Sequence, residues 1–172
     1  GRLSSLEREL VIWLAVEREP LSLVGLENNL VELASRGEVL TAIRALQRRS
    51  LMEQVDGGNA PAAGERVARF TLQNVVTEYV TERLLAKIAQ EVVNEQPDWL
   101  NRYALLKAQT TEYVRQSQER LLVQPLAKQL TARLGRAGLA TTLQRILDRL
   151  RTQTPLAPGY AAGNILNLLL CA

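Results

Sequence analysis

The feature that most constrains the fold is a change of hydrophobic period within residues 69–85, RFTLQNVVTEYVTERLL. Before Gln73, apolar and polar residues alternate, which predicts a half-buried strand that ends near Leu72. After Asn74, apolar residues recur at four-residue steps, which predicts a long helix to about Asn94. Its apolar face consists of Val76, Val80, Leu84, Ile88 and Val92. A strand therefore runs almost directly into a helix, with a polar pair at the joint.

The residues before this joint predict three helices and a β-hairpin. Serines stand where helices are expected to begin: Ser4 or Ser5, with Glu7 in the first turn, then Ser22, then Ser35. The expected core-facing residues are Leu6, Leu10, Trp13, Leu14, Val39, Ile43 and Leu46. The runs LMEQV and VARFTL, joined by the loop DGGNAPAAGER, predict the hairpin. Three helices followed by a hairpin predict a winged helix-turn-helix domain over residues 1–78.

The remaining residues predict an α-helical arm or bundle over 79–156. Pro97 interrupts the helix that starts at the joint, and LNRYALLKAQTTEYVRQSQERLL then predicts one long helix that Pro125 kinks or ends. The run LATTLQRILDRL is amphipathic, with an inward stripe of Leu139, Leu143, Ile146, Leu147 and Leu150. Residues 157–172 predict a connector and the start of a following domain, expected to consist of repeats. The expected fold is mainly α, and we expect the chain to be a piece of a longer one.

Composition excludes several kinds of site. The 172 residues include no histidine, so His-based catalysis and His-containing metal sites are excluded, and no metal site is expected. Neither G-x-x-x-x-G-K-[ST] nor G-x-G-x-x-G occurs. The one cysteine, Cys171, permits no disulfide framework. No apolar run reaches the roughly 18 residues of a membrane span, and the start is not a signal peptide. We expect a cytoplasmic protein with no catalytic residues and no membrane partner.

Charge is distributed unevenly along the chain. Residues 1–96 carry 11 basic and 14 acidic side chains, whereas residues 97–172 carry 10 and 4. Two segments of opposite sign indicate two structural units, and the basic one suits an acidic partner or domain. Within it, Arg145, Arg149 and Arg151 are expected to form the ordinary polar face of an amphipathic helix.

A DNA-binding function is the alternative to consider. The third helix of a winged helix can enter the major groove, where Arg44, Arg48 and Arg49 would meet phosphates. Arg66 and Arg69 in the wing would reach the neighbouring groove. The first half is net acidic, however, and nonspecific DNA affinity comes mainly from clustered positive charge. A solvated arginine face is therefore favoured, and the alternative is a transcriptional regulator with a helical dimerisation region.

The polar pair at the joint also has two interpretations. Asn74 is well placed to cap a helix that starts at Val75. Gln73 is expected to point outward beside the helix N-terminus, where free N–H groups favour an anion such as a phosphate. Capping and solvation account for both residues without any ligand.

The string Phe70-Thr71-Leu72-Gln73-Asn74-Val75-Val76 resembles the Phe-x-Met-His-Asp-Leu-Val motif of STAND-type signalling NTPases, the NB-ARC class of plant resistance proteins and the apoptosome scaffold. Leu72 matches the Met, Gln73 the His and Asn74 the Asp. The string looks especially like bacterial, notably cyanobacterial, members. In those, a helical segment, a GYAAGN-type string like Gly159–Asn164 here, and pentapeptide or WD-type repeats follow.

The resemblance implies a regulatory, non-catalytic role. An upstream P-loop domain, absent from this chain, would bind ATP or ADP, and the winged helix would pack on it to hold the ADP-bound off state. The family's sensor histidine touches the β-phosphate, so Gln73 and Asn74 are the implied cofactor-binding residues. A neutral Gln73 can donate one hydrogen bond but lacks the charge of a protonated histidine. The implied partners are the upstream nucleotide domain and the downstream repeats, with oligomerisation on activation.

Overall fold

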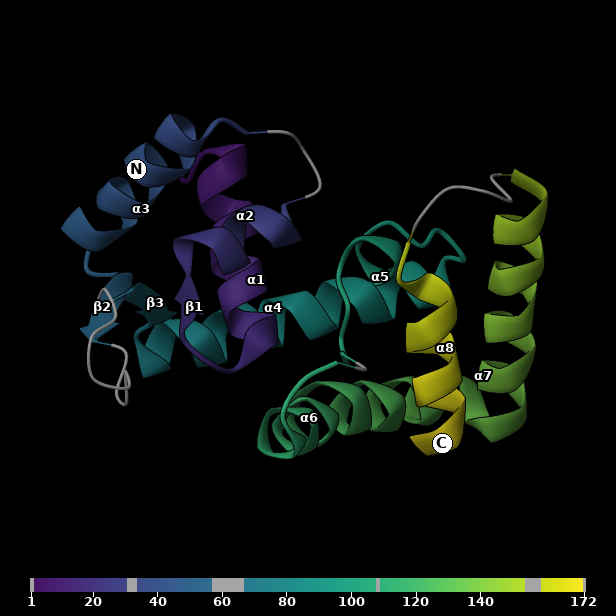
Figure 1. Ribbon diagram of the computed structural model, residues 1–172. Helices are drawn as coiled ribbons and strands as arrows, with labels where there is room; N and C mark the ends of the chain where they lie inside the picture. Colours follow the sequence, from purple (N-terminus) through teal and green to yellow (C-terminus); the bar gives the residue numbers. More distant parts are fainter. Residues whose placement is uncertain (1, 31–33, 57–66, 108, 154–158, 172) are drawn as a thin grey trace. The chain divides into compact units, whose positions relative to one another are not determined.

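The structure, a computed structural model, describes residues 2–30, 34–56, 67–107, 109–153 and 159–171. The chain divides into two compact units, Gly1–Thr81 and Glu82–Ala172. The fold is mainly helical, as predicted, and the described residues form one small antiparallel sheet, in the first unit (Figure 1). The domain ranges 1–78, 79–156 and 157–172 remain predictions.

The first unit combines helices with the sheet. Its elements are α1 (Ser5–Glu17), β1 (Leu21–Ser22), α2 (Leu23–Asn29), α3 (Arg36–Arg48), β2 (Met52–Asp56), β3 (Ala68–Leu72) and the start of α4 (Asn74–Val93). The sheet order is β1-β3-β2. Strands β2 and β3 are the predicted hairpin, with Met52 opposite Leu72. Strand β1, where Leu21 lies opposite Phe70, was not expected, because two residues are too short to show an alternating pattern.

The predicted helix starts are confirmed in the first unit. Ser4 accepts a hydrogen bond from the Glu7 N–H (3.1 Å), and the Glu7 carboxylate accepts one from the Ser4 N–H (2.7 Å). Ser35 and Glu38 form the same reciprocal capping box at the start of α3. Ser22 accepts from the Gly25 N–H (3.1 Å). Each bond joins residues three apart, so these helix starts are determined locally.

The core of the first unit lies between the helices and the sheet. Its buried members are Leu10, Val11, Leu14, Ala15, Leu26, Val39, Ala42, Ile43, Leu46, Met52, Phe70 and Leu72. The predicted stripe of α3 and the alternation of β3 are therefore both confirmed. Val76 and Val80 pack against this cluster, so the first turns of α4 belong to the core that β3 leads into.

The described residues of the second unit form helices and connecting loops and contain no strand. The unit contains the rest of α4, α5 (Trp99–Arg102), α6 (Glu112–Gln118), a π-helical turn η1 (Glu119–Val123), α7 (Gln124–Gln153) and α8 (Ala161–Cys171). The prediction of one long helix after Pro97 is wrong, because the chain leaves the helix after Arg102 and resumes it at Glu112. Helix α8 packs against α5, α7 and η1 in this unit (Figure 1).

Buried side chains from distant positions hold the non-helical backbone between α5 and α6. The Asn164 amide in α8 donates to the Leu100 and Tyr103 carbonyls (2.7 and 2.8 Å), and its oxygen accepts from the Leu105 N–H (3.0 Å). The buried Gln118 accepts from the Lys107 N–H (3.1 Å). These bonds satisfy backbone groups that a helix would otherwise pair, which explains why the predicted helix is interrupted here.

Glu91 plays a similar role at the start of α5. One oxygen of this buried carboxylate accepts hydrogen bonds from the N–H groups of Asp98, Trp99 and Leu100 at 3.1, 2.8 and 3.2 Å. Burial raises the pKa of Glu91, opposed by these hydrogen bonds and by the charge of Lys87. A side chain in α4 thereby caps a helix that begins after the Pro97 break.

Helix α7 contains a break that was not predicted. Gly135 has φ 69° and ψ 162°, a conformation almost restricted to glycine, so two helical limbs meet there. Pro125 does not end a helix. It lies in the first turn of α7, directly after the wider π-helical turn η1, and the chain remains helical on both sides of it. Beyond Gly135, Leu139, Leu143 and Ile146 are buried, as predicted, whereas Leu147 and Leu150 of the predicted stripe are only half-buried.

The arginines of the second limb are not merely solvated, contrary to expectation. Arg145 forms an ion pair with the Glu95 carboxylate (2.7 Å), and Arg149 donates to the Glu95 carbonyl (2.6 Å). Arg151, as expected, lies on the exposed face, 3.7 Å from Asp148. Two of the three arginines therefore connect α7 to the turn that follows α4.

Candidate functional site

The joint between β3 and α4 has a different cap from the predicted one. The Gln73 carbonyl accepts hydrogen bonds from the Thr77 N–H (2.9 Å) and the Thr77 hydroxyl (3.2 Å). Helix α4 begins at Asn74, one residue earlier than expected, so Gln73 holds the N-cap position and Asn74 the first helical position. The Gln73 N–H donates to the Leu51 carbonyl (3.3 Å), which ties the joint to the end of α3 and the start of β2.

A small pocket of about 190 Å³ lies at this joint. It is lined by Leu14, Arg18, Thr71, Leu72, Asn74, Thr77 and Glu78. Leu72 and Asn74, two of the three residues predicted from the sequence, line it, whereas the half-buried Gln73 is not among its lining residues. The lining combines two hydroxyls, an amide, a cation and a carboxylate with the first turn of α4.

Arg18 is the charged residue of this pocket that the sequence did not identify. It follows α1 in a left-handed conformation (φ 60°), and its guanidinium donates to the Thr81 hydroxyl (2.8 Å). The Arg18 Nε–H is buried and has no hydrogen-bond partner. Burial lowers the pKa of Arg18, and the charge of Glu78 opposes that shift. Arginine nevertheless stays protonated in proteins, so the pocket contains a partly desolvated cation.

The pocket has the chemistry to hold a small oxyanion. Free N–H groups in the first turn of a helix favour negative charge, and the Arg18 cation adds to that preference. Glu78, on the same lining, opposes it. No feature of the sequence around Arg18 indicates this placement, because its hydrogen-bond partner Thr81 is 63 residues away.

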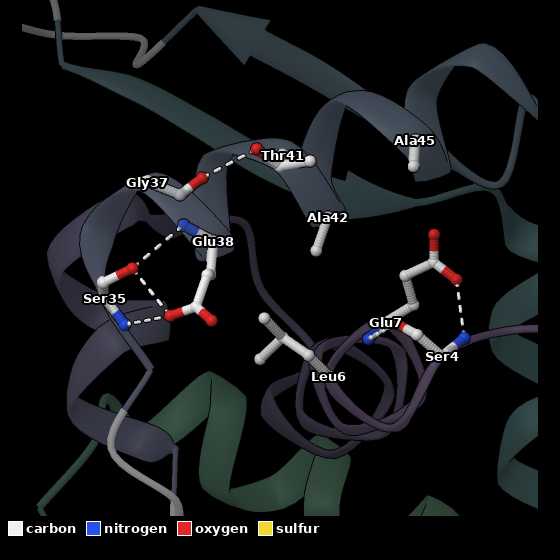
Figure 2. Close-up of a pocket in the computed structure, with 9 residues that line it drawn as sticks. All are labelled: Ser4, Leu6, Glu7, Ser35, Gly37, Glu38, Thr41, Ala42 and Ala45. Atoms are coloured by element: carbon white, nitrogen blue, oxygen red, sulfur yellow. Dashed lines mark hydrogen bonds between the residues drawn. The ribbon is translucent and has the colours of Figure 1, made fainter.

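A second, open groove of about 440 Å³ lies where α1 and α3 begin (Figure 2). Figure 2 shows the Ser4–Glu7 and Ser35–Glu38 capping boxes at its two ends, with Leu6 between them. The Glu38 hydrogen bonds to Ser35 lower the pKa of Glu38. Because the boxes already occupy these polar groups, the groove is a weaker ligand-site candidate than the joint pocket.

The arginines of the DNA-binding alternative are not equivalent in the structure. Arg44 and Arg48 are exposed on α3, and Arg69 is exposed on β3. Arg49 instead lies 3.4 Å from the buried Glu7 carboxylate, so its charge is partly neutralised. Arg66 lies outside the described residues. DNA binding stays a prediction.

Within the described ranges, His, Cys, Asp and Glu side chains form no group of three or more suited to a metal ion. Of the helices there, none combines the length and apolarity needed to cross a lipid bilayer.

Comparison with known proteins relates the chain to a cyanobacterial protein. No model of a known protein family matches the chain. The chain is similar to an uncharacterized WD repeat-containing protein of the cyanobacterium Nostoc sp. (strain PCC 7120), with 35% identity over 202 aligned positions that include 98% of this chain. The chain spans 15% of the length of that relative. The predicted resemblance to cyanobacterial proteins with WD-type repeats is thereby confirmed.

Proposed function

We propose that this chain is the winged-helix and helical-arm region of a STAND-type signalling NTPase with C-terminal WD-type repeats. The first unit packs on an upstream P-loop domain and stabilises its ADP-bound off state, and the second links that domain to the repeats. The region itself is non-catalytic, the protein is cytoplasmic, and activation involves oligomerisation. The proposal depends above all on the match of nearly the whole chain to a small part of a WD repeat-containing relative.

The topology of the first unit supports the winged-helix part of this proposal. Its element order, α1-β1-α2-α3-β2-β3, and its antiparallel sheet order, β1-β3-β2, agree with the winged helix proposed here. The resemblance at residues 70–76 coincides with the point where β3 ends and α4 begins. Winged helices have many functions, so this agreement supports the fold, and the nucleotide role depends on the joint itself.

The joint pocket supports a nucleotide role by its chemistry. Leu72 and Asn74, at the positions of the family's Met and Asp, line it, and Arg18 supplies a positive charge that the neutral Gln73 lacks. In this proposal a β-phosphate of ADP lies near the start of α4, and Gln73 donates one neutral hydrogen bond to it. The contact is weaker than that of a protonated histidine, so the off state is held less tightly.

The test uses the longer protein that contains this region. Gln73→Ala should speed ADP release by about two- to tenfold, the effect of losing one neutral hydrogen bond. Gln73→His should slow release below pH 6.5, where a histidine is protonated. Gln54→Ala is the matched control, because Gln54 is an exposed glutamine on β2 in the same sheet. Unchanged release in all three variants, measured with a fluorescent ADP analogue, would reject the sensor role of Gln73.

The DNA-binding alternative has its own test. The exposed Arg44 and Arg48 on α3 are the observation in its favour. Fluorescence anisotropy with a labelled duplex should show no binding of the 172-residue chain at physiological salt if the signalling proposal is right. Binding that falls steeply with salt and disappears in the Arg44→Ala/Arg48→Ala variant would favour the transcriptional regulator instead.

A further inference from the structure

Helix α8 has apolar residues on two faces, and one face is uncovered within its unit. The inward residues Ala161, Ile165 and Leu168 are buried. On the other side, Leu166, Leu169 and Leu170 are 58%, 40% and 77% exposed. The range Ala161–Cys171 contains no charged residue. We call these three leucines the outward stripe, since spacings of three and four residues place side chains on one side of a helix.

The outward stripe belongs to a fixed helix, not to a frayed end. Asn164 makes three buried hydrogen bonds to the backbone around α5, which anchor the middle of α8. At its start, the Ala161 N–H donates to the Asn101 side chain (3.2 Å), and the Tyr160 N–H donates to the Asn101 carbonyl (2.9 Å). The GYAAGN string therefore attaches α8 to α5, and the stripe keeps a defined direction relative to the second unit.

We propose that the outward stripe is the docking surface for the polypeptide that follows residue 172 in the longer protein. This inference rests on the proposed function, in which the repeat domain continues from α8. Adjacent exposed leucines on an anchored, uncharged helix are typical of an interaction surface. Since the stripe contains no charge to pair with, its occupant presents apolar side chains at the centre of the contact.

The proposed function favours this occupant over others, because in it the repeats follow α8. The region equivalent to this chain is 15% of the WD repeat-containing relative, so most of that protein lies outside it. The stripe ends at Leu170, and a segment tethered within a few residues has a local concentration on the order of millimolar. A free partner or a second copy must compete with that concentration. The following segment therefore occupies the stripe first.

Hydrogen exchange of the amides of residues 165–171 tests the proposal in the 172-residue chain and in the longer protein. Exchange there should slow by about tenfold or more in the longer protein. The variant Leu166→Glu/Leu170→Glu should abolish that protection, because docking would bury two unpaired charges. Tyr113→Glu is the matched control, since Tyr113 is 76% exposed on α6 of the same unit. Both variants should unfold at the midpoint of the unaltered 172-residue chain.

The outcomes separate this inference from the proposed function. Equal exchange in the short and long proteins overturns the docking proposal. A concentration-dependent dimer of the 172-residue chain that Leu166→Glu/Leu170→Glu dissolves, without added protection in the longer protein, also overturns it in favour of a second copy. ADP retention is measured on the same preparations. Protection without bound nucleotide would support the docking surface while rejecting the nucleotide role.

Discussion

The polar contacts that cap helices in the first unit and those that hold the loops of the second unit differ in range. In the first unit, Ser4, Ser22 and Ser35 cap helices through partners three residues away. In the second, Asn164 and Asn101 bond to backbone groups about 60 residues away, and Glu95 pairs with arginines 50 or more residues away. Local caps can be identified in a sequence, whereas distant closures depend on the finished fold. Because distant contacts such as those of Asn164 are buried, we expect the loss of one of them to lower the free energy of unfolding more than the loss of one local cap does.

The largest effect is expected from Asn164→Ala. This change leaves two carbonyls and one N–H in a buried region without their partner, and each buried unsatisfied group costs about 1–3 kcal/mol. We expect a loss of about 3–5 kcal/mol in the free energy of unfolding, measured by urea titration. Asn167→Ala in the same helix is the control and should cost less than about 1 kcal/mol. Equal costs for the two variants would refute the buried network.

Glu91→Ala should have the next largest effect. It removes the acceptor shared by three N–H groups at the start of α5, and we expect a loss of about 2–4 kcal/mol by urea titration. Glu91→Gln keeps an acceptor oxygen and should cost clearly less. A glutamine variant as damaged as the alanine variant would mean that charge, not hydrogen bonding, dominates this cap.

The pH dependence of Glu91 has a defined sign. Because its pKa is raised in the folded protein, the folded state binds more protons than the unfolded state between the ordinary glutamate pKa and the raised one. Its contribution to stability therefore increases as pH falls through that window. The stability difference between the unaltered chain and Glu91→Gln should grow in the same direction in urea titrations at several pH values. A difference that shrinks on acidification would contradict this.

Two glycine substitutions should change the stability by smaller amounts and with opposite signs. A Cβ on Gly159 would collide with the Asn101 side-chain amide, whose oxygen accepts from the Ala161 N–H, so Gly159→Ala should cost about 1–3 kcal/mol. Gly163 has open space around it inside α8, so Gly163→Ala should stabilise by roughly 0.5–1 kcal/mol. Thermal unfolding of both variants checks this; a shift of the same sign in both would show that the Asn101 contact is unimportant.

The smallest effect is expected from a local cap. Ser35→Ala removes the hydroxyl that accepts from the Glu38 N–H and donates to the Glu38 carboxylate at the start of α3, which costs about 1 kcal/mol. Ser50→Ala is a control, because Ser50 is exposed and lies after α3. If Ser35→Ala destabilises the protein more than Asn164→Ala does, the contrast between the two units is wrong.

The same contrast explains how much of the molecule the sequence could predict. Serine caps, the alternation of β3 and the apolar stripe of α3 are local patterns, and all were predicted. The break between α5 and α6 could not be predicted, because the backbone groups that it leaves unpaired are satisfied by the side chain of Asn164 in α8. At the candidate site, Leu72 and Asn74 were predicted by position, but Arg18 reaches that pocket only after α1 packs against the sheet. The start of α4 at Asn74, one residue earlier than predicted, was also missed.

The break at Gly135 allows α7 to fit within the second unit. Helix α7 contains 30 residues, which would measure about 45 Å if it were straight. A unit of roughly 90 residues has a radius of gyration of about 12 Å and is about 30 Å across. An unbroken α7 would project out of its own unit, taking Leu139, Leu143 and Ile146 into water. One residue without a side chain therefore lets a helix longer than the unit's diameter contribute to the core with both limbs.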